Sequence, residues 1–404
     1  MNRKLDLRTG RPVWTAYRVP SVPTEKLMRD VKADVAIVGM GISGAMIAET
    51  LTAEGHGVVC IDRRAPMKGS TAATTALVQF EIDQPLTTLL AMIGRTKAER
   101  AWRRSRLAIE NLAARIMELD INCGLVRRPS LYLAGKTLAP QDLRDEADAR
   151  RRAGIHAVYL TKAALAERFG IERDGAILSR GNLSLDPRRL TSGLLLKALE
   201  RGVRFYAPAE AISVSGGRDK VTVATKDGPT VTASHVVLAT GYELVDIVPA
   251  AKHSIISTWA IATCRQPRKL WPEEAFVWEA SDPYLYLRAT KDGRVICGGE
   301  DEDFSDEAQR DELIGRKAAR LADKLGRLFP QLDPTPEFAW TGSFGTTTTG
   351  LPYLGQVPNR PRIHAVMGYG GNGITYSHIA SEVIASALAG REDCDTDLFA
   401  FNRR

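Results

Sequence analysis

The order of hydrophobic and polar positions predicts alternating strands and helices near the start of the chain. Residues 35–39 form an apolar run with strand character, residues 42–53 have the apolar spacing of a helix, and residues 58–62 form a second apolar run. A strand, a helix and a second strand within about thirty residues make a β-α-β unit, whose two strands lie parallel in one sheet.

The rest of the chain alternates helices with two β-rich blocks. Apolar residues at helical spacing predict helices over residues 97–119, 190–201 and 314–328. Asp227-Gly228 and Asp292-Gly293 each join two alternating segments, and this dipeptide is typical of hairpins because both turn residues adopt positive φ. The blocks span residues 211–241 and 255–299, and a last strand at 363–367 precedes a helix ending at 389. The pattern favours an α/β (mixed α+β) chain with a Rossmann-like domain and a β-rich second domain.

A glycine motif stands at the end of the first predicted strand and opens the first helix. Gly39-Met40-Gly41-Ile42-Ser43-Gly44 fits G-x-G-x-x-G, in which the glycines allow a tight turn, close approach of a pyrophosphate and close packing of helix on strand. The helix N-terminus offers free N–H groups to phosphates. Asp62 ends the second strand, where a carboxylate accepts hydrogen bonds from an adenosine ribose. We therefore expect a dinucleotide site rather than an empty glycine turn.

Three further features favour FAD over NAD as the dinucleotide. The chain has a single such motif, which disfavours a flavin reduced by NAD(P)H at a second Rossmann site. A strand meander leads into residues 236–241, ending in Thr240-Gly241. A second glycine cluster, residues 368–373, lies between a predicted strand and helix, and such a helix N-terminus suits the flavin edge that becomes negative on reduction.

Composition and charge narrow the class of protein. The 404 residues carry a net charge of +7, and no apolar window is long enough for a membrane span. Basic residues gather at 100–104 and 150–152 without interleaved aromatics, so we interpret them as solvated helix faces and expect no nucleic-acid partner. Five scattered cysteines show no metal or disulfide pattern. We expect no metal, no secretion signal and a cytoplasmic location.

Several segments together resemble the D-amino-acid-oxidase-like family of FAD-dependent oxidoreductases, in the branch of γ-glutamylputrescine oxidase, glycine oxidase and sarcosine oxidase. The resemblance covers residues 14–401. It depends on the glycine motif, on residues 69–76 (GSTAATTA) and on the turn Ala239-Thr240-Gly241. It depends also on residues 293–299 (GRVICGG), on residues 350–355 (GLPYLG) and on the final glycine cluster.

The resemblance implies a discontinuous FAD-binding domain under a β-rich substrate domain that roofs the flavin. It places residues 33–90, 184–250 and 340–404 in the first domain, residues 91–183 and 251–339 in the second, and residues 1–32 in an N-terminal arm. The residues expected to bind FAD are Gly39, Gly41, Ile42, Ser43, Gly44, Asp62, Arg63, Ser70, Thr71, Thr74, Thr75, Ala211, Thr240, Gly241, Gly371, Asn372, Gly373, Ile374 and Thr375.

Departures from the family pattern indicate how the flavin is held. Sarcosine-type enzymes attach FAD through a cysteine shortly before the GLPYLG-like segment, but residues 340–345 here read WTGSFG. Related dehydrogenases use a histidine after the second strand, where residues 72–75 here read AATT. We therefore expect noncovalent FAD. The lysine that sarcosine oxidases place above the flavin for oxygen activation is absent from residues 257–259, so the electron acceptor, oxygen or a carrier, stays open.

The resemblance implies oxidation of a C–N bond in a small amine or amino acid, by hydride transfer to flavin N5 and hydrolysis of the imine. The alternative is a flavin-dependent oxidoreductase of hydroxy acids or other C–O substrates on the same scaffold. A non-enzymatic FAD or NAD module is disfavoured by the full set of flavin-binding segments.

The candidate substrate residues carry two interpretations each. Alternation along residues 284–288 puts Tyr284, Tyr286 and Arg288 on one face of a strand. Arg288 then either clamps a substrate carboxylate between aromatic walls or pairs with an acid inside the fold. Trp259 and Tyr369 either wall the substrate pocket or pack in the core.

Overall fold

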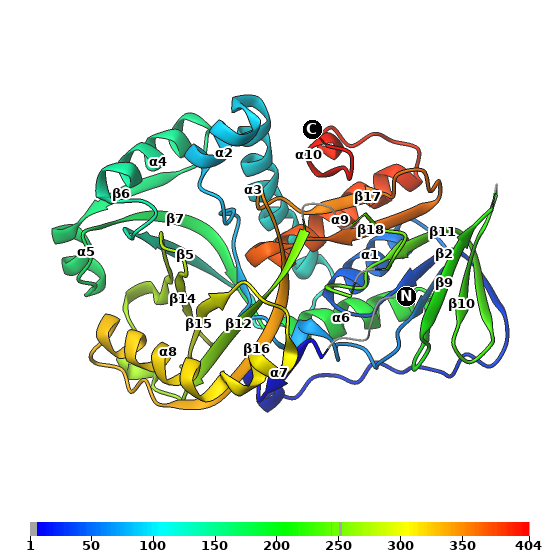
Figure 1. Ribbon diagram of the computed structural model, residues 1–404, viewed down its shortest axis with the longest axis horizontal. Helices are drawn as coiled ribbons and strands as arrows, with labels where there is room; N and C mark the ends of the chain where they lie inside the picture. The colour runs from blue at the N-terminus through cyan, green and yellow to red at the C-terminus, as the bar shows by residue number, and fades with distance from the viewer. Residues whose placement is uncertain (1–5, 218, 244, 250–252, 404) are drawn as a thin grey trace.

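The computed structural model describes residues 6–217, 219–243, 245–249 and 253–403, and within them two sheets lie side by side (Figure 1). The smaller sheet has the strand order β17-β18-β11-β2-β3-β8, with β10 paired to β11 and β9 paired to β10. The larger sheet has the order β1-β16-β12-β15-β14-β13-β5-β7-β4, with β6 attached to β7. The α/β class predicted from the sequence is confirmed.

The smaller sheet contains the predicted β-α-β unit at its centre. β2 (Val31–Val38) pairs in parallel with β3 (Val58–Ile61) and with β11 (Thr230–Leu238). Both faces of these strands are covered, which explains why they read as continuous apolar runs rather than alternating ones. The remaining strands are β8 (Arg204–Tyr206), β9 (Ala211–Gly216), β10 (Val221–Thr225), β17 (Tyr353–Gln356) and β18 (Ile363–Met367).

Helices cover one face of the smaller sheet and pack closely on one another. α1 (Ile42–Ala53) contacts both α6 (Pro187–Glu200) and α9 (Gly373–Leu388), and α9 also contacts α3 (Arg95–Glu118). Buried side chains from these helices and from β2 share one hydrophobic cluster. The N-termini of α1 and α9 therefore come close together, although more than three hundred residues separate them in the sequence.

The larger sheet has one face covered by α8 (Ile314–Leu328). Leu321, Leu325 and Leu328 of this helix pack in one cluster with Trp259 and Leu287 of the sheet. The stripe predicted from the spacing of apolar residues is thus the packing face of α8. The strands of this sheet are β1 (Arg8–Gly10), β4 (Leu77–Val78), β5 (Val126–Leu133), β6 (Ala157–Thr161), β7 (Gly175–Ser184), β12 (His253–Thr263), β13 (Phe276–Glu279), β14 (Leu285–Ala289), β15 (Val295–Glu302) and β16 (Pro336–Thr347).

Three details differ from the sequence-based expectation. The hairpin strand expected at 230–232 and the buried strand at 236–239 are one strand, β11, which pairs with β10 at its start and with β2 along its length. The boundary predicted at residue 340 falls inside β16. The arm is not irregular throughout, since β1 pairs with β16 and the buried Trp14 lies in the core. The domain limits themselves stay a prediction.

The other α-helices lie outside the two central sheets. They are α2 (Leu86–Ile93), α4 (Pro140–Arg152), α5 (Lys162–Phe169), α7 (Glu307–Glu312) and α10 (Thr396–Phe399).

The interpretation of residues 150–152 as a solvated face is wrong for Arg150. This residue is fully buried on α4, pairs with Glu146 and lies over the ring of Trp102.

No helix in the described part of the chain combines the length and apolar character required to cross a lipid bilayer. The five cysteines are all unpaired.

A buried histidine in the smaller sheet makes this domain sensitive to acid. Burial, and to a smaller extent the charge of the neighbouring His235, lowers the pKa of His364 on β18 to about 4. Between the ordinary pKa of 6.5 and about 4, the unfolded chain binds a proton that the folded chain does not, so stability falls as the pH falls through this range. We expect the melting temperature of His364→Asn to fall less between pH 7 and pH 4.5 than that of the parent protein.

The matched control is His156→Asn, because His156 is exposed. Thermal unfolding followed by circular dichroism gives both curves. An acid-induced loss in His364→Asn as large as that of the parent would contradict this account of β18.

Candidate functional site

A long cavity between the two sheets brings most of the predicted site residues together. Val38 and Leu238 of the smaller sheet and Thr258, Ala260 and Tyr286 of the larger sheet line it. The predicted residues that border it are Gly39, Gly41, Ile42, Ser43, Asp62, Arg63, Ser70, Thr71, Thr74, Thr75, Ala211, Thr240, Gly241, Trp259, Tyr286, Tyr369, Gly371, Asn372, Gly373 and Ile374. Gly44, Thr375 and Arg288 do not line it.

The glycine turn between β2 and α1 has no room for side chains. A Cβ on Gly39 (φ +114°) would lie 2.3 Å from the carbonyl oxygen of Ala239. A Cβ on Gly44 would lie 1.9 Å from the carbonyl oxygen of Gly39, so Gly44 acts through helix–strand packing and not by lining the cavity. A Cβ on Gly41 would lie 3.2 Å from Thr71 Oγ1. Gly41 is the N-cap residue of α1, at the surface of the cavity.

Asp62 joins the glycine turn to the end of β3. One carboxylate oxygen accepts the Met40 N–H and the other accepts the Arg64 N–H, both at 2.7 Å. Burial raises the pKa of this carboxyl group, and the two backbone donors counteract that rise. The neighbouring Arg63 forms an ion pair with Glu243. This end of the cavity therefore carries charged groups that are already paired with one another.

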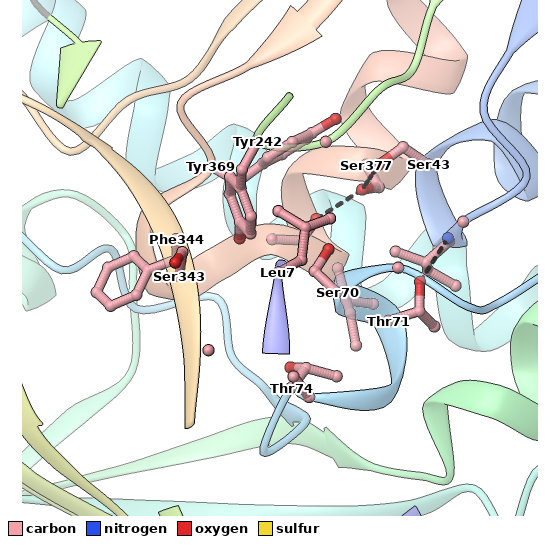
Figure 2. A pocket seen from close by; sticks show the side chains of 18 of the residues that line it. Leu7, Ser43, Ser70, Thr71, Thr74, Tyr242, Ser343, Phe344, Tyr369 and Ser377 are labelled. Carbon is pink, nitrogen blue, oxygen red and sulfur yellow. Dashed lines mark hydrogen bonds between the residues drawn. The ribbon is translucent and has the colours of Figure 1, made fainter. Parts of the chain in front are cut away.

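Two indole rings hold the segment that follows β3. Trp14 Nε1 donates to the carbonyl oxygen of Thr74 at 2.6 Å, and Trp340 Nε1 donates to that of Ala73 at 2.8 Å. Ser70, Thr71 and Thr74 face the cavity (Figure 2). Thr71 Oγ1 also accepts the Ile42 N–H at 3.1 Å and so connects this segment to the first turn of α1.

The first turn of α9 faces the same cavity as the first turn of α1. The hydroxyl oxygens of Ser43 on α1 and Ser377 on α9 are 2.8 Å apart, and both line the cavity (Figure 2). Thr375, which does not line it, donates from Oγ1 to the carbonyl oxygen of Gln79 at 2.7 Å. Asn372 Nδ2 donates to the carbonyl oxygen of Glu81 at 2.8 Å. The start of α9 is thus fixed by polar contacts to residues 79–81.

Aromatic side chains enclose the part of the cavity beyond α9. Tyr242 and Tyr369 meet edge to face with ring centroids 6.1 Å apart, and Tyr284 and Tyr286 lie 5.2 Å apart. Burial raises the pKa of all four phenols, so they are neutral at physiological pH. Tyr369 lines the cavity, but it also packs in the hydrophobic core and donates from its hydroxyl to the carbonyl oxygen of Val366 at 3.2 Å, so its role as a substrate wall stays a prediction.

Two of the predicted substrate residues have their functional groups elsewhere. Trp259 borders the cavity, but its Nε1 donates to the carbonyl oxygen of Arg310 at 3.1 Å and its ring lies 4.6 Å from Lys317 Nζ, in the cluster under α8. The guanidinium of Arg288 is fully buried and donates to the carbonyl oxygens of Ala76 and Leu185 and to Ser184 Oγ. The core interpretation therefore fits Trp259 better than a direct substrate contact. The guanidinium of Arg288 is a structural group as well, but its partners are carbonyl and hydroxyl oxygens and not the acid expected from the sequence.

Sequence reasoning missed four cavity residues in one stretch. Leu77, Gln79, Glu81 and Asp83 line the cavity, while the residues between them are buried in the core. The signal was present in the sequence, because residues 77–83 (LVQFEID) alternate around apolar positions that face the core. The aromatic residues Trp278, Trp340 and Phe344 were also missed.

A small acidic group near the C-terminus is explained by ion pairs. Asp393, Cys394 and Asp395 are the described His, Cys, Asp and Glu side chains that lie close enough together to share a metal ion. Arg104 Nη2 lies 2.9 Å from Asp393, and Arg100 Nη2 lies 3.1 Å from Asp395. These arginines supply the opposite charge, so the group is a link between α3 and the C-terminal segment.

The close approach at Gly44 predicts a large effect of the smallest side chain. We expect Gly44→Ala to lower the melting temperature strongly, because its Cβ would overlap the carbonyl oxygen of Gly39 and separate α1 from the turn. Gly315→Ala on α8 is the control, since its Cβ would meet open space. That variant should keep or gain stability, by about 0.5–1 kcal/mol for a helical glycine. Equal melting temperatures for the two variants would refute the packing argument.

Comparison with known proteins agrees with this geometry. The chain is 25% identical over 378 residues to γ-glutamylputrescine oxidoreductase of Escherichia coli, with 91% of this chain and 86% of the relative covered. It is 24% identical over 393 residues to glycine oxidase of Geobacillus kaustophilus, with 91% and 96% covered. The crystal structure of glycine oxidase from that organism matches the fold with a TM-score of 0.75 over 92% of this chain and 99% of the other, at 22% identity.

A second solved structure, L-amino acid deaminase from Proteus vulgaris, matches with a TM-score of 0.76 at 17% identity, covering 96% of this chain and all of the other. At these identities the structural matches show the fold alone. The family model described as FAD dependent oxidoreductase matches residues 34–387, which include both glycine-lined helix N-termini and the strands between them. The chain therefore belongs to the FAD-dependent oxidoreductase family.

Proposed function

We propose that this protein binds FAD noncovalently in the long cavity and oxidises a C–N bond of a small amine. The observation that carries the proposal is the pairing of two helix N-termini, those of α1 and α9, on one continuous cavity that ends among aromatic side chains. Free N–H groups and the helix dipole favour anionic groups at both places. FAD has such groups in its pyrophosphate and at the pyrimidine edge of the reduced ring.

The residues fit FAD from end to end. We assign the adenosine ribose to Asp62, the pyrophosphate to the Gly39–Gly41 turn, and the ring to the region between Thr74 and the first turn of α9. The close approach of the backbone at this turn depends on Gly39, where a Cβ would overlap the carbonyl oxygen of Ala239, and on Gly41, where a Cβ would lie 3.2 Å from Thr71 Oγ1. Among the described residues that line the cavity there is neither cysteine nor histidine, which supports a noncovalent cofactor.

When bound, FAD supplies the acceptor for a hydride from the carbon next to the amine nitrogen. The nitrogen releases a proton, and water converts the resulting imine to a carbonyl compound and the free amine. The chain itself positions the donor carbon and keeps water away with Tyr242, Tyr369 and Phe344, which line the cavity. A strong side-chain base is not required, because a neutral amine provides its own lone pair.

The charges around the cavity favour an amine over a hydroxy acid. A hydroxy acid presents a carboxylate, and the cationic side chains that line the cavity in the described part of the chain are Arg63 and Arg64. Both lie beside Asp62 and pair with Glu243. The names of γ-glutamylputrescine oxidoreductase and glycine oxidase also point to nitrogen compounds. Oxygen and a protein carrier both stay open as the electron acceptor, and a cytoplasmic location stays a prediction.

Denaturing extraction tests how the flavin is held. We expect acid precipitation of the pure yellow protein to leave the flavin in the supernatant, because the cavity lining supplies no covalent attachment. Absorbance spectra of supernatant and washed pellet give the distribution. Flavin that stays with the pellet after washing would contradict noncovalent binding.

Anaerobic reduction tests the reaction class. We expect small amines to bleach the visible band of the oxidised flavin, while hydroxy acids of the same carbon skeleton leave it unchanged. The absence of oxygen removes the question of the acceptor from the measurement. Bleaching by hydroxy acids but not by amines would support C–O oxidation in place of C–N oxidation.

A further inference from the structure

A row of polar side chains lines the cavity next to the start of α9. Gln79, Glu81 and Asp83 line the cavity at alternate positions. Phe80 and Ile82, which lie between them, and Val78, which precedes them, are buried in the hydrophobic core. The chain therefore turns one carboxamide and two carboxylates toward the cavity within five residues.

Atoms of this row are buried without hydrogen-bond partners inside the protein. Gln79 is 9% exposed and its Nε2 has no partner; Glu81 is 2% exposed and its Oε2 has none. The other carboxylate oxygen of Glu81 accepts from Ser130 Oγ. A buried carboxylate oxygen without a donor costs free energy, so Glu81 Oε2 is a position for a donor that comes from outside the chain.

The backbone holds the row in a fixed position. Asn372 Nδ2 at the start of α9 donates to the carbonyl oxygen of Glu81 at 2.8 Å, and the Phe80 N–H donates to Asn182 Oδ1 at 3.1 Å. Asp83 accepts the Gly371 N–H at 2.7 Å. Glu81 through its backbone and Asp83 through its carboxylate are thus attached to the same helix start that we assign to the flavin ring.

The surroundings of the row favour a positive charge. Burial raises the pKa of Asp83, and its charge contributes to the raised pKa of Tyr242 and Tyr284. An ammonium group beside Asp83 would lower the pKa of this carboxyl group again. The rings of Trp278, Tyr284 and Tyr286 line the same region, and aromatic faces attract cations.

From this arrangement we propose that the substrate is an aliphatic diamine or polyamine, whose second ammonium group binds Glu81 and Asp83. The proposal rests on the proposed function and names its substrate class. The charged nitrogen at the row is not the reacting one, because hydride transfer needs an unprotonated nitrogen and a neighbouring carboxylate keeps a nitrogen protonated. The reacting amine is therefore the one at the other end of the molecule.

Equilibrium binding to the flavin-loaded protein tests the row without turnover. The probe is 1,4-diaminobutane, its matched monocation is 1-aminobutane, and both are titrated anaerobically into protein whose flavin has been reduced with dithionite and so cannot accept a hydride. Isothermal titration calorimetry should show the dication binding at least about tenfold more tightly than the monocation, which corresponds to about 1.4 kcal/mol. In Glu81→Gln and Asp83→Asn this ratio should fall toward one.

The control is Glu167→Gln, an exposed carboxylate on α5 that does not line the cavity. It should keep the parent's ratio. Equal affinities for the two probes in the parent, or an unchanged ratio in both variants, would overturn the proposal. Since the two variants are separate tests, a failure of Glu81→Gln to fold leaves Asp83→Asn to decide.

Anaerobic bleaching separates this inference from the proposed function. Faster bleaching by 1,4-diaminobutane than by 1-aminobutane, lost in Asp83→Asn, supports both. If glycine or 1-aminobutane bleaches the flavin and the diamine does not, C–N oxidation is kept and the proposal of a diamine substrate is overturned. Bleaching by no amine at all removes the proposed function together with the inference.

Discussion

The contact between the glycine turn and the first turn of α1 is the constraint on which the rest of the site depends. At Gly39 and Gly44 the backbone of β2, α1 and the end of β11 approach so closely that even a methyl group does not fit. This contact sets the direction in which α1 opens. Its N-terminus then faces the cavity at the carboxyl ends of β2 and β11, where open α/β sheets bind their ligands.

The second helix start is placed by side chains and not by a motif. Ser377 on α9 meets Ser43 on α1, and Thr375 and Asn372 attach the first turn of α9 to residues 79–81. Asn372 and Gly371 at the start of α9 also hold Glu81 and Asp83, which line the cavity. The protein thus joins an anion-favouring helix start to a cation-favouring row of carboxylates. An enzyme that binds a reduced flavin and an amine side by side needs both.

Local patterns predicted much of this architecture from the sequence. The bounds of α1 were predicted to the residue, because the glycine turn and the apolar runs on either side define them. Long-range placement was harder to infer. Alternation put Tyr286 and Arg288 on one face of β14, but it does not tell where along that face the cavity ends. Arg288 lies beyond its end, where backbone carbonyls and Ser184 surround it. The ring of Trp259 lies on the face of β12 that packs under α8 and not on the face toward the cavity. Which face a side chain occupies depends on the register of the strand and not on its composition.

The account makes one central claim, that the starts of α1 and α9 hold opposite parts of a single FAD. The most direct measurement is a crystal structure of the protein purified in its yellow form. It should show the pyrophosphate at Gly41 and Ile42 and the pyrimidine edge of the ring at Gly373 and Ile374. Density for the ring away from α9, with the first turn of that helix facing solvent, would contradict the claim.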